Sequence, residues 1–227
     1  MCSSADGLRR RRAVFSGIIR HAATVVRVSD TAAAPAHASG ANETARAHGL
    51  RLQLEMSGDF PAVRTGDSVA VNGVCLTVTS HGEAARTLCF DVVPETVRRS
   101  NLATLVSGDI VNVEPSLRLG DQLGGQFVYG HVDATTQIAA NEPEGQGFRL
   151  WCALPSGLKS LIVEKGYVAL DGVSLTIAAV EGGRFAVALV PETLKRTTLG
   201  RKTAGASVNI EADPIARYVA ALMPRLP

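Results

Sequence analysis

The stretches VNGVCLTV at 71–78 and LDGVSLTI at 170–177 are two versions of one short sequence. Four of the eight positions are identical, and the cysteine of the first version, Cys75, is replaced by a serine, Ser174, in the second. The surrounding sequence is retained while one small nucleophilic side chain changes, which indicates two related sites with different functions.

Further blocks recur in the same order along the chain. VPETVRRSNL at 93–102 matches VPETLKRTTL at 190–199 with six identities in ten, and VNVE at 111–114 matches VNIE at 208–211. These blocks and the first pair are offset by 99, 97 and 97 residues. Repeated blocks at a fixed offset predict the duplication of a domain of about 100 residues.

A weaker match relates FSGII at 15–19 to VYGHV at 128–132, with an offset of 113 residues. The first copy therefore has fourteen residues more than the second between this block and the next. We place them near 29–49, where small residues, Pro35 and Gly40 interrupt any strand pattern. This stretch is expected to be an exposed insertion.

The rest of each copy has the alternation of short strands. LRLQLEM at 50–56 alternates apolar and polar residues, and FRLWCAL at 148–154 places Phe148, Leu150, Cys152 and Leu154 on one face. The strands TLCFDVV and RFAVALV each end at a VPET, because proline cannot donate to a sheet. We expect the two VPET segments to be turns in which Glu95 and Glu192 pair with nearby arginines.

No segment with a helical period lies between the strands, which favours an all-β protein with two tandem six-stranded antiparallel barrels. Helical spacing occurs only at 213–223, with Asp213 as the N-cap and Pro214 as the first helical residue. The repeat and this C-terminal helical segment together give the predicted organisation of the chain. It comprises a leader at 1–14, either disordered or transit-like, an N-terminal barrel at 15–117, a C-terminal barrel at 118–212 and a helical tail at 213–227.

Composition argues against several classes of function. The formal net charge is +2, and four arginines at 9–12 against Asp6 contribute +3 of it, so the body of the chain offers no basic surface for nucleic acid. Aromatic residues make up only 4%. The four cysteines show no C-x-x-C spacing, so we expect free thiols, no metal site and a cytoplasmic location. No apolar run approaches the roughly 18 residues of a membrane span.

Seven blocks together resemble riboflavin synthase of the alpha-chain type: FSGII, GDSVAVNGVCLTVT, DVVPETVRRSNL, LGGQFVYGHVD, KGYVALDGVSLTIAAV, VPETLKRTTLG and VNIEADPIARY. The resemblance covers 15–28 and 50–220. It implies two Greek-key barrels, no cofactor, and an enzyme that converts two molecules of 6,7-dimethyl-8-ribityllumazine into riboflavin and 5-amino-6-ribitylamino-uracil. It also implies a homotrimer in which each active site holds two lumazines between the N-terminal barrel of one subunit and the C-terminal barrel of the next.

The resemblance also implies which residues act. Its acting side chains are Ser174, Thr176 and Asp213 in the second barrel and Cys75, Thr77 and His131 in the matching blocks. We expect Ser174 and Asp213 in the pocket that activates the lumazine that donates four carbons, and we expect Cys75 and His131 to assist at the other ring. His131 stands out because the matching residue of the first copy is Ile18. The remaining residues implied in substrate binding are Phe15, Gly17, Ile18, Ile19, Ser68, Leu76, Thr77, Asp91, Val92, Val93, Pro94, Glu95, Thr96, Gly130, Val132, Lys165, Leu175, Ala188, Leu189, Val190, Pro191, Glu192 and Thr193.

Two alternatives stay open at this stage. A non-catalytic paralogue that only binds lumazine or flavin would keep the same barrels, and a nucleic-acid-binding β-barrel would belong to another class. The presence of Cys75, His131, Ser174 and Asp213 argues against the first, and the nearly neutral body with few aromatic residues argues against the second.

Overall fold

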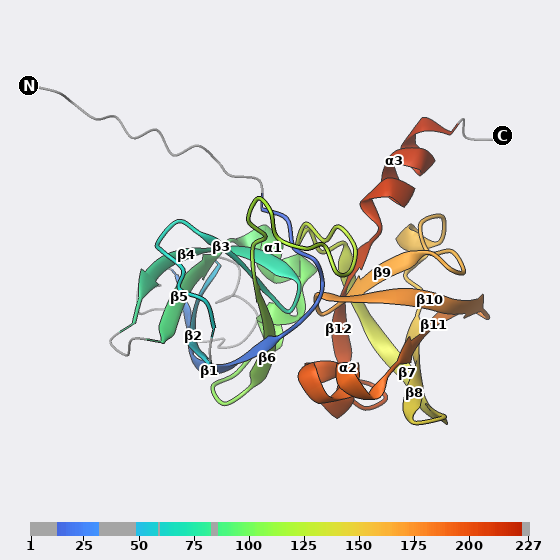
Figure 1. Ribbon diagram of the computed structural model, residues 1–227, viewed down its shortest axis with the longest axis horizontal. Helices are drawn as coiled ribbons and strands as arrows, with labels where there is room; N and C mark the ends of the chain where they lie inside the picture. The colour runs from blue at the N-terminus through green and yellow to red at the C-terminus, as the bar shows by residue number, and fades with distance from the viewer. Residues whose placement is uncertain (1–12, 32–48, 59, 83–85, 224–227) are drawn as a thin grey trace, which may run out of the picture.

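The computed structural model describes residues 13–31, 49–58, 60–82 and 86–223. It consists of two closed antiparallel barrels that lie side by side, with a helix at the C-terminal end that projects from the second barrel (Figure 1). Most of the predicted leader at 1–14 and of the predicted insertion at 29–49 lies outside the described residues.

The first barrel has the strand order β1-β2-β5-β4-β3-β6. Its strands are β1 (His21–Asp30), β2 (Leu50–Met56), β3 (Ser68–Val71), β4 (Val74–His81), β5 (Thr87–Val92) and β6 (Ile110–Pro115). Since β6 returns to lie beside β3 of the consecutive strands β3, β4 and β5, the connection is a Greek key.

The second barrel repeats this order strand for strand, with β7 in the place of β1 and β12 in the place of β6. Its strands are β7 (Ala134–Glu144), β8 (Gly147–Ala153), β9 (Tyr167–Leu170), β10 (Val173–Glu181), β11 (Arg184–Leu189) and β12 (Ser207–Ala212). The two repeated barrels confirm the all-β class and the duplication predicted from the sequence.

Each barrel encloses its own apolar core. In β2, Leu50, Leu52, Leu54 and Met56 are all buried, as the alternating pattern predicts. In β8, Leu150 and Cys152 are fully buried, but Phe148 is 39% exposed. Phe148 is one residue from the end of the β7–β8 hairpin, where Glu144 pairs with Gly147, so its ring lies at the barrel rim.

The expectation that both VPET segments are turns was wrong. They begin two short helices, α1 (Pro94–Arg99) and α2 (Pro191–Arg196), followed by the single 3₁₀ turns η2 (Asn101–Thr104) and η4 (Thr198–Arg201). Proline suits the first turn of a helix, and Glu95 and Glu192 lie in that turn, where the helix dipole favours an acid. The predicted ion pairs are present, since Glu95 contacts Arg98 and Arg99, and Glu192 contacts Arg196.

The predicted C-terminal helix is α3 (Pro214–Leu222). The Asp213 side chain caps it by accepting a hydrogen bond of 2.9 Å from the Ile215 N–H, and Pro214 occupies the first turn. A further 3₁₀ turn, η3 (Ser156–Leu158), lies between β8 and β9.

The repeated stretches at 71–78 and 170–177 form two tight turns that meet back to back between the barrels. Asn72 and Asp171 both have a φ of +44°, and each is followed by a glycine with positive φ, as a two-residue hairpin turn requires. A Cβ atom on Gly73 would lie 2.5 Å from the backbone nitrogen of Gly172. Only glycine therefore fits at this contact, which brings the barrels into register.

Buried polar side chains surround these turns and join the two barrels. The Asn101 amide donates to the Asp171 carboxylate over 2.9 Å, and the Asn209 amide donates to the Asn72 carbonyl over 2.7 Å. Asp171 is fully buried, which raises its pKa, while Lys202 at 3.2 Å lowers it again. The hydrogen bonds depend on both halves, so the barrels hold a single relative orientation.

Candidate functional site

Two segments cross from one barrel to the other. We call residues 13–20, which precede β1, the first arm, and residues 125–133, which precede β7, the second arm. The arms pair antiparallel at their middle: the Phe15 N–H donates to the Val128 carbonyl over 2.7 Å, and the Val128 N–H donates to the Phe15 carbonyl over 3.1 Å. Each arm then contacts the start of a repeated strand in the opposite barrel before it enters the first strand of its own barrel.

The contact between arm and strand is the same in both halves. The Ser174 N–H of β10 donates to the Gly17 carbonyl over 2.8 Å, and the Cys75 N–H of β4 donates to the Gly130 carbonyl over 3.0 Å. Gly17 and Gly130 both have a φ of +71°. A Cβ atom would lie 2.6 Å from the Ser174 Cβ in one case and 2.5 Å from the Cys75 nitrogen in the other. The arms therefore touch the two positions at which cysteine in one repeat is replaced by serine in the other.

A cavity of about 440 Å³ opens beside Cys75. Six residues predicted from the sequence lie in its wall, and they come from both barrels. They are Cys75, Glu95, Thr96, Gly130, His131 and Val132. Its other lining residues include Arg99 and Asp133, so the cavity wall has charges of both signs.

The chemistry of this cavity depends on Cys75 and His131. Burial raises the pKa of the Cys75 thiol, and a hydrogen bond with Ser68 opposes that shift. The thiol is consequently protonated at neutral pH and behaves as a small, weakly polar wall atom rather than as a thiolate. The His131 side chain is exposed and stacks on Tyr129, with 6.1 Å between ring centroids. The imidazole is thus accessible from the cavity.

Ser174 occupies the matching place in the second half and is half-buried. Its surroundings come from both arms, because Gly17 packs on it and a Cβ atom on Gly125 would lie 3.1 Å from the Ser174 Cβ. Thr176, two residues further along β10, is exposed on the same outer face of the strand.

Strand alternation separates the neighbouring predicted residues into buried and exposed side chains. Leu76 and Leu175 belong to the barrel cores, so only their backbone is available to a ligand. Thr77 lies exposed on β4, opposite Ser68 of β3. Asp213 lies where β12 ends and α3 begins, and it does not line the cavity beside Cys75.

The remaining predicted residues are placed as follows. The ranges 91–96 and 188–193 span the junctions of β5 with α1 and of β11 with α2, and Val93 and Val190 are exposed there while Val92 and Leu189 are buried. Lys165 lies in the turn before β9, with a φ of +64°, and is exposed. Phe15 is fully buried between the arms and contacts the small apolar cluster with Ala70, Val128 and Ala169.

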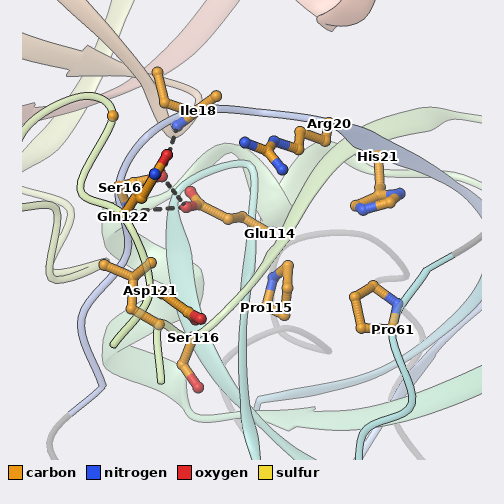
Figure 2. A pocket seen from close by; sticks show the side chains of 12 residues that line it. Ser16, Ile18, Arg20, His21, Pro61, Glu114, Pro115, Ser116, Asp121 and Gln122 are labelled. Carbon is orange, nitrogen blue, oxygen red and sulfur yellow. Dashed lines mark hydrogen bonds between the residues drawn. The ribbon is translucent and has the colours of Figure 1, made fainter. Parts of the chain in front are cut away.

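A second cavity, of about 460 Å³, lies beside the first arm. Its wall contains Ile18, which the sequence singled out, and Arg20 and Glu114, which it did not. Figure 2 shows the Glu114 carboxylate turned toward Ser16, with hydrogen bonds between them. The recurrence of a glutamate at the end of VNVE and VNIE was the signal that the sequence offered.

Neither a metal cluster nor a membrane helix occurs in the described ranges. Among those residues, no three His, Cys, Asp or Glu side chains gather closely enough to hold a metal ion. Likewise, no helix in that part of the chain is both long and apolar enough to cross a membrane.

The duplicated barrels agree with the class of lumazine-binding proteins. The family model described as the lumazine binding domain matches the chain twice, at residues 16–116 and 129–213. Among solved structures, the crystal structure of LumP complexed with riboflavin superposes with a TM-score of 0.74, over 87% of this chain and 98% of that one. At 21% identity, that likeness concerns the fold.

Curated relatives narrow the class. The chain is 40% identical to riboflavin synthase of Brucella abortus (strain 2308), over 77% of this chain and 88% of the relative. It is 44% identical to riboflavin synthase of Chlamydia pneumoniae, over 74% and 82%, and 38% identical to that of Escherichia coli (strain K12), over 88% and 87%. The chain belongs to the riboflavin synthase family.

Proposed function

We propose that this protein is a riboflavin synthase, which transfers a four-carbon unit between two molecules of 6,7-dimethyl-8-ribityllumazine. The products are riboflavin and 5-amino-6-ribitylamino-uracil. The observation that supports it most directly is the identity of 38–44% to riboflavin synthases over most of both chains. The twin barrels suit a reaction between two copies of one substrate, because each barrel presents a related but unequal strand to an arm, with Cys75 in one half and Ser174 in the other.

The chemistry demands positioning more than strong acids or bases. The first step removes a proton from the methyl group at C7 of one lumazine, and the resulting anion is delocalised over the electron-poor ring. Such a step requires fixed geometry, a proton acceptor and hydrogen-bond donors for the charge that develops. The protonated Cys75 thiol and the accessible His131 imidazole in one cavity meet these needs for one ring.

The roles of the individual side chains are part of the proposal. Ser174, Thr176 and Asp213 activate the lumazine that gives up four carbons, and Cys75 and His131 assist at the other ring. Lys165 and the backbone of the two strand–helix junctions bind the ring and the ribityl chain. The Cys75 to Ser174 change is then the difference between an accepting and a donating pocket.

We also propose that a homotrimer forms the active site between the first barrel of one subunit and the second barrel of the next. The face of α3 supports association with a second copy of the chain. Its apolar residues Ile215, Tyr218, Val219 and Leu222 follow helical spacing and are all more than half exposed. Ala216 and Ala220 pack on the barrel core on the opposite face, so the exposed stripe has no partner within the described chain.

Domain limits of 15–117 and 118–212 are proposed on the same basis, since β1 to β6 and β7 to β12 fall within them. The cytoplasmic location stays a prediction that rests on the cysteine pattern, and Cys75, Cys89 and Cys152 are all free.

Incubation of the purified full chain with the lumazine tests the function. Riboflavin absorbance and an equimolar amount of the pyrimidine are expected; binding without turnover would identify a ligand-holding paralogue instead. Ser174→Ala and Asp213→Asn are expected to lower turnover at least tenfold, since asparagine still caps α3 and the helix is preserved. Ser80→Ala, an exposed serine of β4, is the control. Turnover like that of the unaltered protein in both variants would remove their assignment.

A further inference from the structure

Two buried carboxylates hold the arms. Glu114 of β6 and Glu211 of β12 are each only 6% exposed and stand at matching positions of the two repeats. Neither forms an ion pair shorter than 4.0 Å within the described residues. Their partners are backbone groups, since Glu114 accepts from the Ser16 and Gly17 N–H groups over 2.8 and 3.1 Å.

The second half repeats the arrangement. Glu211 accepts from the Tyr129 N–H over 2.9 Å and from the Gly130 N–H over 3.0 Å. In the first arm the Ser16 hydroxyl adds a bond of 2.7 Å to Glu114 and accepts from the Ile18 N–H over 3.2 Å (Figure 2). Each carboxylate therefore fixes the glycine of the arm that begins its own barrel.

The glycine so fixed is the one that contacts the opposite barrel. Glu114 belongs to the first barrel, but the Gly17 that it holds bonds Ser174 of the second. Glu211 belongs to the second barrel, but the Gly130 that it holds bonds Cys75 of the first. Each glutamate is thus connected, through the glycine that it holds, to Ser174 or Cys75 of the opposite barrel.

Burial of a carboxylate without a cation in direct contact is costly, and apolar residues of similar volume commonly give a more stable core. Stability alone therefore does not account for a glutamate in both copies. Hydrogen bonds from two consecutive N–H groups to the two oxygens of one carboxyl group fix the position of a backbone more firmly than apolar packing does. Fixed backbone is what a reaction between two stacked rings requires.

We propose that Glu114 and Glu211 are positioning residues, each of which anchors the arm that completes the ring pocket of the opposite barrel. The claim that these glutamates contribute to turnover rests on the proposed function, whereas the claim that they anchor the arms does not. The consequence is a crossed dependence: the backbone position at Ser174 depends on a glutamate of the first barrel, and the cavity beside Cys75 depends on a glutamate of the second.

Hydrogen–deuterium exchange followed by mass spectrometry tests this on the full chain without any substrate. Glutamine keeps the shape of glutamate, but its amide accepts only one of the two N–H groups and turns a donor toward the other. In Glu211→Gln we expect exchange at residues 73–77 and 127–133 to accelerate about tenfold, because a buried donor loses its partner. In Glu114→Gln the same acceleration is expected at 15–19 and 172–176.

Glu142→Gln is the matched control, since its carboxylate accepts from the Trp151 indole over 3.0 Å, away from both arms. It should leave all four segments unchanged. If either glutamine variant does not fold, Ser16→Ala, which removes one bond to Glu114, still has to accelerate exchange at 172–176 by several-fold. Acceleration confined to the barrel that bears the substitution, or spread evenly over both barrels, overturns the proposal.

Steady-state kinetics with the lumazine separate this inference from the proposed function. For both glutamine variants we expect kcat to fall about tenfold. If the unaltered protein has no turnover but each glutamine variant accelerates exchange in the opposite barrel, the anchoring by Glu114 and Glu211 is supported and the proposed synthase activity is refuted. Normal turnover in both variants would instead remove Glu114 and Glu211 as positioning residues for the reaction.

Discussion

The contact of Gly130 with Cys75 gives the sharpest prediction about activity. In Gly130→Ala the new Cβ atom would lie 2.5 Å from the Cys75 nitrogen, whereas ordinary contacts of a Cβ atom begin at 3.4 Å. The second arm must then retreat by roughly 0.9 Å, and a misplacement of about 1 Å is enough to cost on the order of 100-fold in rate. We therefore expect kcat for riboflavin formation to fall by about two orders of magnitude.

The same substitution also strains the backbone, and a control separates the two effects. An alanine at a φ of +71° costs about 1–2 kcal/mol in any left-handed position. Gly145, in the β7–β8 hairpin, has a φ of +60°, and a Cβ atom there would have no neighbour within 4 Å, so Gly145→Ala has the strain without the collision. Both variants should lose similar backbone stability, and only Gly130→Ala should also lose the hydrogen bond from the Cys75 N–H, worth about 1 kcal/mol.

The assay is the initial rate of riboflavin formation, together with thermal unfolding of both variants. Turnover of Gly130→Ala within twofold of Gly145→Ala would refute the reasoning, because it would mean that the arm does not set the geometry of the Cys75 cavity.

Two further predictions concern stability. Burial raises the pKa of Glu211 to about 7, against the hydrogen bonds from Tyr129 and Gly130, with nearby Asp133 raising it further and Arg217 lowering it. Between pH 4.5 and 7 the folded state thus holds a proton that the unfolded state releases. The free energy of unfolding therefore falls by about 3 kcal/mol as the pH rises through this window. Glu211→Gln should flatten that fall in thermal melts from about pH 5 to 8, and a pH dependence equal to that of the unaltered protein would contradict the assignment. Lys202→Met should lower the free energy of unfolding in urea by about 3 kcal/mol, because it leaves the Asp171 carboxylate buried without its cation, and adding Asp171→Asn should restore much of the loss. No recovery in the double variant would show that Lys202 acts through packing rather than through charge.

Much of the fold was accessible from the sequence because β-structure repeats every two residues and the chain repeats itself. The strands β2, β5 and β11 and the cap of α3 lie where their patterns predict. Segments shorter than two helical turns were not predictable in this way. The six-residue helices α1 and α2 follow from proline, glutamate and arginine at helix-end positions, which also suit a turn.

Burial at the barrel rim likewise required the structure. Phe148 was expected on the buried face with Leu150 and Cys152, but the hairpin end leaves it exposed. Trp151, which alternates with these residues, is buried instead, and the Arg184 guanidinium covers its ring at 4.0 Å. The alternation of β8 specifies which side chains share a face, but it does not specify where the barrel ends.

The candidate site also has a part that the sequence predicted and a part that required the structure. The sequence identified Cys75 and Ser174 by comparison of its two halves, and His131 by the lack of a counterpart. That the arms cross, so that Gly130 meets Cys75 and Gly17 meets Ser174, is decided by pairing between residues about 55 or 157 positions apart, which local patterns do not record. The contacts of Glu114 with Gly17 and of Glu211 with Gly130 are likewise between residues far apart in the sequence, so local patterns do not record them either.

The amino-acid sequence by itself determined the duplication, the class of each barrel and the family, because these depend on periodicity and on motifs that are local in the chain. Only the tertiary structure decided which half completes which pocket. The physical reason is that buried carboxylates and glycine contacts acquire their partners when the two barrels come together, through hydrogen bonds across the seam that neither half forms alone.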